Sequence, residues 1–390
     1  MKKCLFFFSI AAFLIWSACS KKPESVARVE IIDGIEYVHN TKVPLHPNKT
    51  VTFEEYLSIG EEDDEGNIVL FRPTGFIVDQ NETIYITDSQ DQVIKVFDTN
   101  GKCIRTIGRK GEGPGEFRSI GYQIFLPDGR LLVIDFSARR TSIFESSGEF
   151  LESHQWFNRL SRLHFATDSS YIITEYTFEG DNPLEGRRLF IKEYDFKGNE
   201  IRSFGEFVPP EMKVHAERNI AIAIGVPHSP QSIFAIDQTQ QYLYHCLNNN
   251  YIIEVFDKTG EVFRKIDRPY EPVPFTSKDA KEFLARYEKS RNENIRKMAK
   301  QMPMPRIKTI TPRMIVDDLG NLWVETHEQK EEEDRTFTAY DIFNIDGYYD
   351  AKVWLEKRPG LFVKGKMYRM HTDEETGYWF LKRYGVIWSD

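Results

Sequence analysis

The chain has 390 residues, of which 51 are Lys or Arg and 60 are Asp or Glu, so its formal charge at neutral pH is −9. This acidic balance excludes a general nucleic-acid binder, whose surface needs a basic excess. Hydrophobic residues make up 41% of the chain and aromatic residues 14%, which is enough for a large core and excludes wholesale disorder.

The first eighteen residues have the pattern of a signal peptide. Lys2 and Lys3 give a positive start, and the apolar run over 5–15 is too short to span a bilayer as a stop-transfer helix. Small residues then precede Cys19. The segment resembles a bacterial lipoprotein signal peptide, and this resemblance implies that Cys19 becomes the lipidated N-terminus.

Cysteine usage points to neither a disulfide framework nor a zinc site. If the signal peptide leaves with Cys4 and the lipid takes Cys19, two cysteines remain, Cys103 and Cys246. They form no CxxC motif or Cys/His cluster. We therefore expect two isolated thiols, no metal and no cofactor.

A repeated pattern of apolar runs organises the rest of the chain. The unit is two apolar runs joined by a polar turn, as in 76–79 followed by 84–88, and it occurs six times. The second runs of these copies begin at residues 84, 131, 171, 242, 322 and 367. A third run ends at a turn glycine, as over 97–101, and a fourth run follows that glycine. Four antiparallel strands repeated in this way predict a six-bladed, all-β propeller.

The sixth copy lacks a fourth strand before the chain ends. Residues 50–60 end in Ser-Ile-Gly, which matches the Thr-Ile-Gly that ends the fourth run of the first copy at 106–108. We expect this N-terminal strand to complete the sixth blade and close the ring. The two ends of the chain would then meet in one blade.

The blade sequence over 72–102, with the glycine-rich segment 111–117, resembles NHL-type propeller repeats. With the signal peptide and the opening over 34–40, the chain resembles the six-bladed propeller lipoproteins of Bacteroidetes. The resemblance implies an outer-membrane anchor. Residues 20–24 lack the acidic cluster associated with surface export in these lipoproteins, so we expect the protein to face the periplasm.

Two long inserts fall on the face of the propeller that carries the linkers between blades. The first covers 206–230, and the second contains a predicted helix over about 277–301 that starts with a Thr276–Asp279 capping box. Its apolar stripe predicts a lid packed on the propeller, although a basic amphipathic helix could also bind a membrane or a partner. The predicted division of the chain is a signal peptide over 1–18, a tether and N-terminal extension over 19–49, and a propeller over 50–390 with a helical insert at about 270–312.

The same linkers carry a basic residue near the start of each blade's first strand. These candidate ligand-binding residues are Arg72, Arg118, Arg162, His228, Arg313 and Arg358. Guanidinium groups at a channel mouth would suit a carboxylate or phosphate through bidentate contacts. The second strands end near acids, so the alternative is a set of structural ion pairs: Arg72 with Asp88, Arg118 with Asp135, Arg162 with Glu175 and Arg313 with Glu325. His228 and Arg358 have no such acid, which makes them the best candidates for a ligand.

Two classes of function remain open. The first is a membrane-tethered, monomeric propeller that binds a glycan, peptide or protein partner through the insert-bearing face without catalysis. The second is a channel-centred hydrolase or lyase that acts on an anionic substrate such as a uronate-bearing glycan. Such an enzyme could hold a metal with histidines predicted on that face, namely His215, His228, His245, His327 and His371. No catalytic residue is assigned.

The segment Gly108–Phe117, GRKGEGPGEF, resembles a phosphate-binding loop only superficially. It contains no Gly-Lys-Ser/Thr, and its glycine spacing does not match GxGxxG. Its glycines instead allow a sharp turn between the first and second blades. We expect the segment to be structural and to place Arg118 at the channel mouth.

Overall fold

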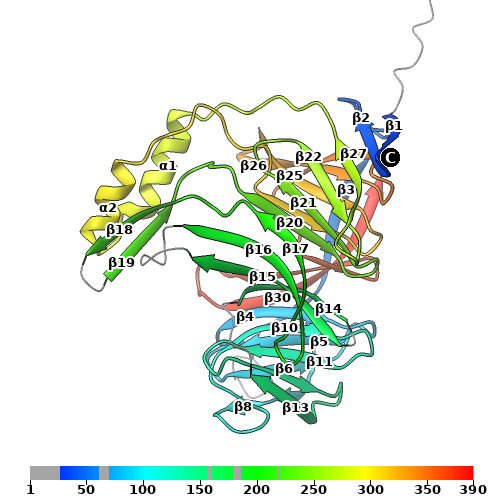
Figure 1. Cartoon of the computed structure of the whole chain (residues 1–390), viewed down its shortest axis with the longest axis vertical. Coiled ribbons are helices and arrows are strands. Elements are labelled where there is room, and N and C mark those ends of the chain that lie inside the picture. Colours follow the sequence, from blue (N-terminus) through cyan, green and yellow to red (C-terminus); the bar gives the residue numbers. More distant parts are fainter. Residues whose placement is uncertain are drawn as a thin grey trace, which may run out of the picture.

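The computed structural model describes residues 27–60, 70–155, 160–167, 169–178, 186–217 and 220–389 (Figure 1). The signal peptide and Cys19 lie outside these residues. The described chain is almost entirely β-structure, with two helices, which confirms the predicted fold class.

Six four-stranded antiparallel units form the blades (Figure 1). Blade one contains β4 (Pro73–Val78), β5 (Ile84–Asp88), β6 (Val93–Phe97) and β7 (Cys103–Ile107). Blade two contains β10 (Ile120–Phe125), β11 (Leu131–Asp135), β12 (Arg140–Phe144) and β13 (Phe150–Gln155). Blade three contains β14 (Leu160–Ala166), β15 (Ser170–Phe178), β16 (Arg187–Asp195) and β17 (Glu200–Phe207). Blade four contains β20 (Ser232–Asp237), β21 (Tyr242–Leu247), β22 (Ile252–Phe256) and β23 (Val262–Asp267). Blade five contains β24 (Arg313–Val316), β25 (Leu322–Glu332), β26 (Arg335–Phe343) and β27 (Tyr349–Leu355).

Blade six joins the two ends of the chain. It contains β28 (Leu361–Val363), β29 (Lys366–Thr372), β30 (Trp379–Ser389) and the N-terminal strand β3 (Thr50–Ile59). The register of β3 on β30 runs from Thr50 opposite Ser389 to Ile59 opposite Leu381. The predicted closure of the ring by residues 50–60 is therefore confirmed.

Burial within each blade follows from stacking against neighbouring blades. All five residues of β5 and of β11 are buried, because these strands lie inside a sheet that is covered on both faces. The fourth strand β7 is mostly exposed, because it lies at the edge of its blade. The resulting core is a series of apolar clusters between successive blades, as expected for a repeat architecture.

An N-terminal hairpin extends blade four, a feature that the sequence analysis missed. Strands β1 (Ala27–Ile32) and β2 (Ile35–Asn40) pair with each other, and β2 runs parallel to β23. The Asn40 side chain then reaches blade five, where it accepts a hydrogen bond from the Tyr349 amide (2.7 Å). Part of the expected tether over 19–49 is therefore a folded cover for a sheet edge.

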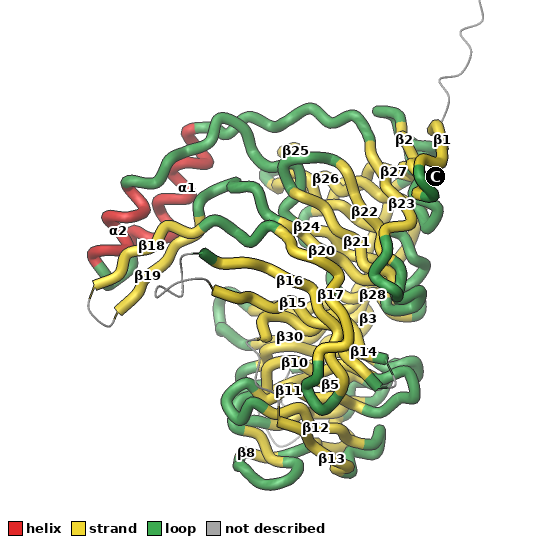
Figure 2. The backbone as a smooth tube through the Cα atoms, viewed as in Figure 1, coloured by secondary structure: helices red, strands yellow, loops and turns green. Residues whose placement is uncertain are grey.

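The two inserts pack against each other. The first forms a hairpin of β18 (Met212–Glu217) and β19 (Ile220–Gly225), and the second forms α1 (Ser277–Glu288) and α2 (Glu293–Lys300), which lie alongside that hairpin (Figure 2). Their contact is an apolar cluster that includes Ile224, Phe283, Met298, Ala299 and Met302. The predicted apolar stripe is therefore present, but it packs on the hairpin of the first insert instead of directly on the blades.

The single helix predicted over 277–301 is wrong in one respect, because two helices occupy this range. The capping box at Thr276 and Asp279 is present and starts α1 as expected. The Asn292 side chain then accepts a hydrogen bond from the Asn294 amide (2.9 Å) and starts α2. A good N-cap residue inside an apolar periodic run allows the chain to end one helix and begin another.

The glycine-rich segment is a structural turn, as predicted. Short strands β8 (Arg109–Lys110) and β9 (Glu116–Phe117) pair across it, and the Glu116 carboxylate accepts a hydrogen bond from the Gly113 amide (2.8 Å). At Gly108 the backbone has φ +75°, and an added Cβ would lie 2.2 Å from the Phe117 ring. A side chain at Gly108 is therefore excluded both by conformation and by space.

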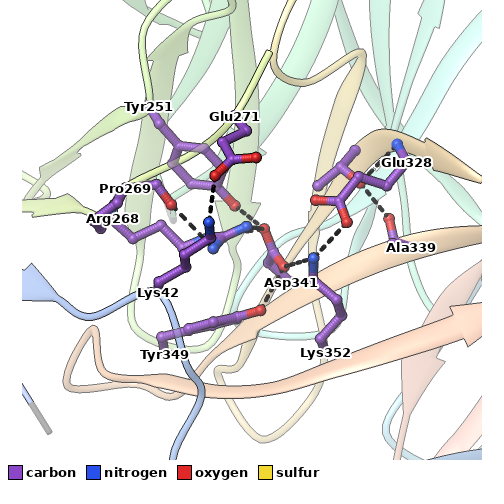
Figure 3. Close-up of polar contacts among 11 residues, drawn as sticks. Lys42, Tyr251, Arg268, Pro269, Glu271, Glu328, Ala339, Asp341, Tyr349 and Lys352 are labelled. Atoms are coloured by element: carbon purple, nitrogen blue, oxygen red, sulfur yellow. Dashed lines mark hydrogen bonds and ion pairs between the residues drawn. The ribbon is translucent and has the colours of Figure 1, made fainter. Parts of the chain in front are cut away.

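A buried ion pair joins blade four to blade five at the point where the helical insert begins (Figure 3). Arg268 donates to Asp341 from Nη2 (2.7 Å) and from Nε (3.0 Å). The hydroxyls of Tyr251 (2.6 Å) and Tyr349 (2.8 Å) donate to the two oxygens of the same carboxylate. Asp341 is completely buried and the Arg268 side chain is 3% exposed, so both charges depend on these contacts for stabilisation.

Substitution of Asp341 by alanine should destabilise the fold strongly, because it leaves the Arg268 guanidinium buried without a counterion. We expect a loss of about 3–5 kcal/mol in the free energy of unfolding, measured by urea denaturation. The matched control is Glu55→Ala, which removes an exposed ion pair to Lys382 and should cost under ~1 kcal/mol. Equal losses in the two variants would contradict the assignment.

Candidate functional site

A cavity of about 620 Å³ lies between the two inserts and the adjoining parts of blades four and five. Its walls come from segments that are distant in sequence. They are the end of the first insert at 225–228, the α1 side chains over 279–287, the return of the second insert at 308–312, β25 and β26 of blade five, and residues 355–358. The cavity exists because the helical insert leaves blade four at Arg268 and returns before β24.

Two histidines lie next to each other in this cavity. The rings of His228 and His327 are 4.7 Å apart, and both contact Thr309. The Thr309 amide donates to His228 Nδ1 (3.1 Å), which fixes one tautomer of that ring because Nδ1 must accept. His228 adopts φ +52°, so this loop conformation holds its ring toward the cavity.

Burial lowers the pKa of both imidazoles. Burial is the main cause at His327, assisted by neighbouring His228, and it lowers the pKa of His327 to about 3. Burial also lowers the pKa of His228, and the nearby cation Lys308 acts in the same direction. Both rings are therefore neutral at physiological pH, where each can offer a hydrogen-bond donor or acceptor without a charge.

Most charged groups in the cavity are paired within it. Lys308 donates to Asp279 (2.7 Å), and Arg358 pairs with Glu325 (3.0 Å). Burial opposes ionisation of Asp279, but hydrogen bonds from Lys308 and Thr276 lower the pKa of this carboxyl to about 2. Asp279 also caps α1, so its pairing to Lys308 ties the start of the helix to the opposite side of the cavity.

One cation and one anion of the lining have no ion-pair partner in the described part of the chain. These are Arg286 and Glu282, which lie one turn apart on the exposed side of α1. Aromatic faces stand beside them, because Tyr287 also lines the cavity and Phe275 packs 5.5 Å from the His228 ring. The cavity therefore combines aromatic faces, neutral imidazoles and a small number of available charges.

The structure brings together two of the six predicted ligand-binding residues. His228 and Arg358 both line the cavity, although Arg358 is already paired with Glu325. Arg72, Arg118 and Arg313 are exposed and do not line it. Arg162 belongs to β14, but its side chain lies outside the described part of the structure. The sequence analysis did not select Lys308, Arg286 or Asp279, because their role depends on how the insert folds back.

Three acids of the expected intrablade ion pairs, Asp88, Asp135 and Glu325, take other partners in the described structure, whereas the pair of Arg162 with Glu175 lies outside it because the Arg162 side chain is not described. Asp88 pairs with Lys95 (3.0 Å) and Glu175 pairs with Lys192 (3.2 Å), in each case a lysine on the next strand of the same blade. Glu325 pairs with Arg358 instead of Arg313. Asp135 accepts a hydrogen bond from the backbone amide of Arg118 (2.6 Å), whose side chain turns to Glu112. A neighbouring strand offers a closer cation than the linker does, since its side chains point to the same face.

The placement of the histidines and the length of the helices bear on the metal-binding and membrane-binding alternatives that the sequence leaves open. Within the described residues, no three His, Cys, Asp or Glu side chains are grouped to hold a metal ion. Neither α1 nor α2 is long and apolar enough to cross a membrane. His228 and His327 meet as a pair, whereas His245 lies in blade four away from the cavity lining.

The low pKa of His327 predicts that the free energy of unfolding decreases as the pH is lowered. The unfolded chain binds a proton at this imidazole near pH 6.5, whereas the folded chain binds it only near pH 3. The unfolded state therefore holds more protons between these values, and stability should decrease as the pH falls through this window. His327→Gln should reduce the slope of the free energy of unfolding against pH by the equivalent of up to one bound proton. The slope is measured by urea denaturation at a series of pH values from 7 to 4. An unchanged slope would contradict the burial of this ring.

Comparisons with known proteins agree with the fold. The DUF5128 family of six-bladed β-propellers matches residues 66–202. A protein of Bacteroides fragilis described as exported superposes with a TM-score of 0.52 at 12% identity, over 91% of this chain and 100% of that chain. A member of the duf4221 family from Bacteroides vulgatus superposes with a TM-score of 0.53 at 11% identity, over 87% and 99% of the two chains. No curated protein matches the sequence. The chain is thus a six-bladed β-propeller that shares its architecture with Bacteroides proteins.

Proposed function

We propose that this protein is a membrane-tethered propeller that binds a polar ligand in the cavity between its two inserts. The observation that carries the proposal is the composition of the cavity wall, where neutral imidazoles, aromatic rings and self-paired charges surround about 620 Å³. Concave sites with a few convergent polar groups are the usual places for small ligands. The cavity also lies on the insert-bearing face where the sequence analysis expects binding.

The charge balance favours an uncharged, hydroxyl-rich ligand such as a glycan. The cations Lys308 and Arg358 are paired with carboxylates, and the two histidines are neutral, so the cavity offers little net positive charge to an anion. The ring faces of Tyr287 and Phe275 suit the apolar faces of a sugar, while Arg286 and Glu282 can bond to hydroxyls. A hydrolase or lyase for uronates would need more than the one unpaired cation, Arg286, that the described lining offers, which makes that alternative the weaker one.

The tether rests on the sequence of the N-terminus. Lipidation of Cys19 would leave seven residues, 20–26, before β1, and a chain of that length spans at most about 25 Å. Blade four, which carries β1 and β2, would then lie close to the membrane. The exported protein of Bacteroides fragilis supports secretion, and we propose a periplasm-facing outer-membrane lipoprotein.

Ligand binding is tested with immobilised neutral and uronate-bearing oligosaccharides. We expect a neutral oligosaccharide to be retained, and Arg286→Gln to weaken its affinity roughly tenfold or more, because a hydrogen bond to a charged group contributes about 1.5–3 kcal/mol. The matched control is Arg72→Gln, an exposed arginine outside the cavity, which should bind like the parent protein. Equal losses of affinity in both variants would indicate that binding depends on arginines outside the cavity, and would contradict the proposal that the cavity is the binding site. Retention of uronates alone would favour the anionic alternative.

The tether is tested by metabolic labelling with a palmitate analogue and by membrane fractionation. Cys19→Ala should abolish the label and release the protein from the membrane fraction, because two acyl chains or more are needed for stable anchoring. Cys103→Ala is the control, since this exposed cysteine should take no lipid. Labelling that persists in Cys19→Ala would overturn the lipoprotein assignment.

A further inference from the structure

A second, smaller cavity of about 260 Å³ lies between blades three and four. Its apolar wall comes from Phe204, Phe207 and Val208 at the end of blade three, and from Leu247 and Phe256 of blade four. Ser232, His245 and Glu254 supply the polar wall. This cavity shares no lining residue with the larger one, so it is a separate site.

The three polar residues form a continuous hydrogen-bonded row across β20, β21 and β22. Ser232 Oγ lies 2.9 Å from His245 Nε2, and His245 Nδ1 lies 3.1 Å from Glu254 Oε2. His245 and Glu254 stand directly opposite each other in the β21–β22 register. A hydroxyl, an imidazole and a carboxylate in this order reproduce the distances and roles of an acyl-transfer triad.

Each member of the row is held in place. The second carboxylate oxygen of Glu254 accepts from Lys265 (2.8 Å), so the carboxylate cannot rotate freely. The His245 ring packs against Phe207, with centroids 4.9 Å apart, and against Phe234 at 5.3 Å. The His245 side chain is 12% exposed, which leaves it accessible from the cavity but shielded from bulk water.

The protonation pattern matches the order of the row. The hydrogen bond from His245 is the main cause that lowers the pKa of Glu254 to about 2, with Lys265 assisting and burial opposing. Glu254 is therefore a carboxylate at neutral pH and accepts the proton on Nδ1. Nε2 is then left to accept from the Ser232 hydroxyl.

We infer that Ser232, His245 and Glu254 form an acyl-transfer centre for carboxylic esters with a small apolar acyl group. Ser232 Oγ attacks the ester carbonyl carbon and gives its proton to Nε2. The bond to the alcohol oxygen then breaks, and the alcohol leaves with that proton. Water hydrolyses the acyl-serine by the same route in reverse, which restores the hydroxyl and releases the acid.

The apolar wall and the small volume of this cavity limit the acyl group that it can hold. Its apolar wall of Phe204, Phe207 and Leu247 fits a short hydrocarbon chain, and about 260 Å³ holds only a small substituent. The Val208 amide donates to Ser232 Oγ (3.1 Å), which holds the hydroxyl oxygen in place beside His245. The inference is independent of ligand binding in the larger cavity.

The test is covalent labelling of the full-length protein with an alkyl fluorophosphonate, followed by intact and peptide mass analysis. The Ser232 oxygen forms the bond to phosphorus, fluoride leaves, and the hydroxyl proton passes to His245. We expect one adduct per chain, located on Ser232, and none in Ser232→Ala. Glu254→Gln should slow labelling by about a hundredfold or more, because its amide no longer stabilises the imidazolium. Hydrolysis of p-nitrophenyl butyrate should be fastest in the parent protein, slower in Glu254→Gln and absent in Ser232→Ala.

The matched control is Ser170→Ala in blade three. Ser170 is a buried serine that donates to the Glu193 carboxylate, so its loss has a comparable structural cost without touching the row. Ser170→Ala should label like the parent protein. Thermal melting confirms that each variant is folded. Absence of an adduct in the parent protein, an adduct on another residue, or unchanged labelling of folded Glu254→Gln would overturn the inference.

Discussion

The larger cavity depends on the helical insert, and the buried pair of Arg268 and Asp341 lies where that insert leaves blade four. Arg268 is the first residue after β23, so it fixes the direction in which the helical insert leaves blade four. A buried ion pair gains little unless every remaining hydrogen-bonding position is filled, and here two tyrosine hydroxyls fill them. The pair therefore acts less as a source of stability than as a constraint on geometry.

The fold could be predicted because it is repeated. Six copies of one strand pattern, and a fragment at 50–60 that matches the end of a blade, were sufficient to place the blades and the closing strand. The hairpin at 27–40 escaped notice because it occurs once and does not belong to the repeat. The break between α1 and α2 escaped for a related reason, since apolar periodicity continues across it while the cap at Asn292 is a single side chain.

The candidate site could be predicted only in outline. His228 and Arg358 were selected because their blades lacked an acid at the expected position, and both line the cavity. The pairing of Arg358 with Glu325 could not be foreseen, because it joins two blades and depends on how they stack. Likewise Ser232, His245 and Glu254 are separated by stretches of ordinary strand sequence. Their row is produced by strand register, which no local motif records.

Ring closure also sets the order of events during folding. Thr50 is opposite Ser389, so the first strand of the propeller cannot pair until the last strand has been made. Contacts over such a separation form slowly, because the entropy of closing the loop is lost before any pairing energy is gained. Until then β3 is an unpaired strand, open to association with other chains. If the chain folds only after all of it has been released, β3 stays unpaired, and open to association with other chains, for the shortest time.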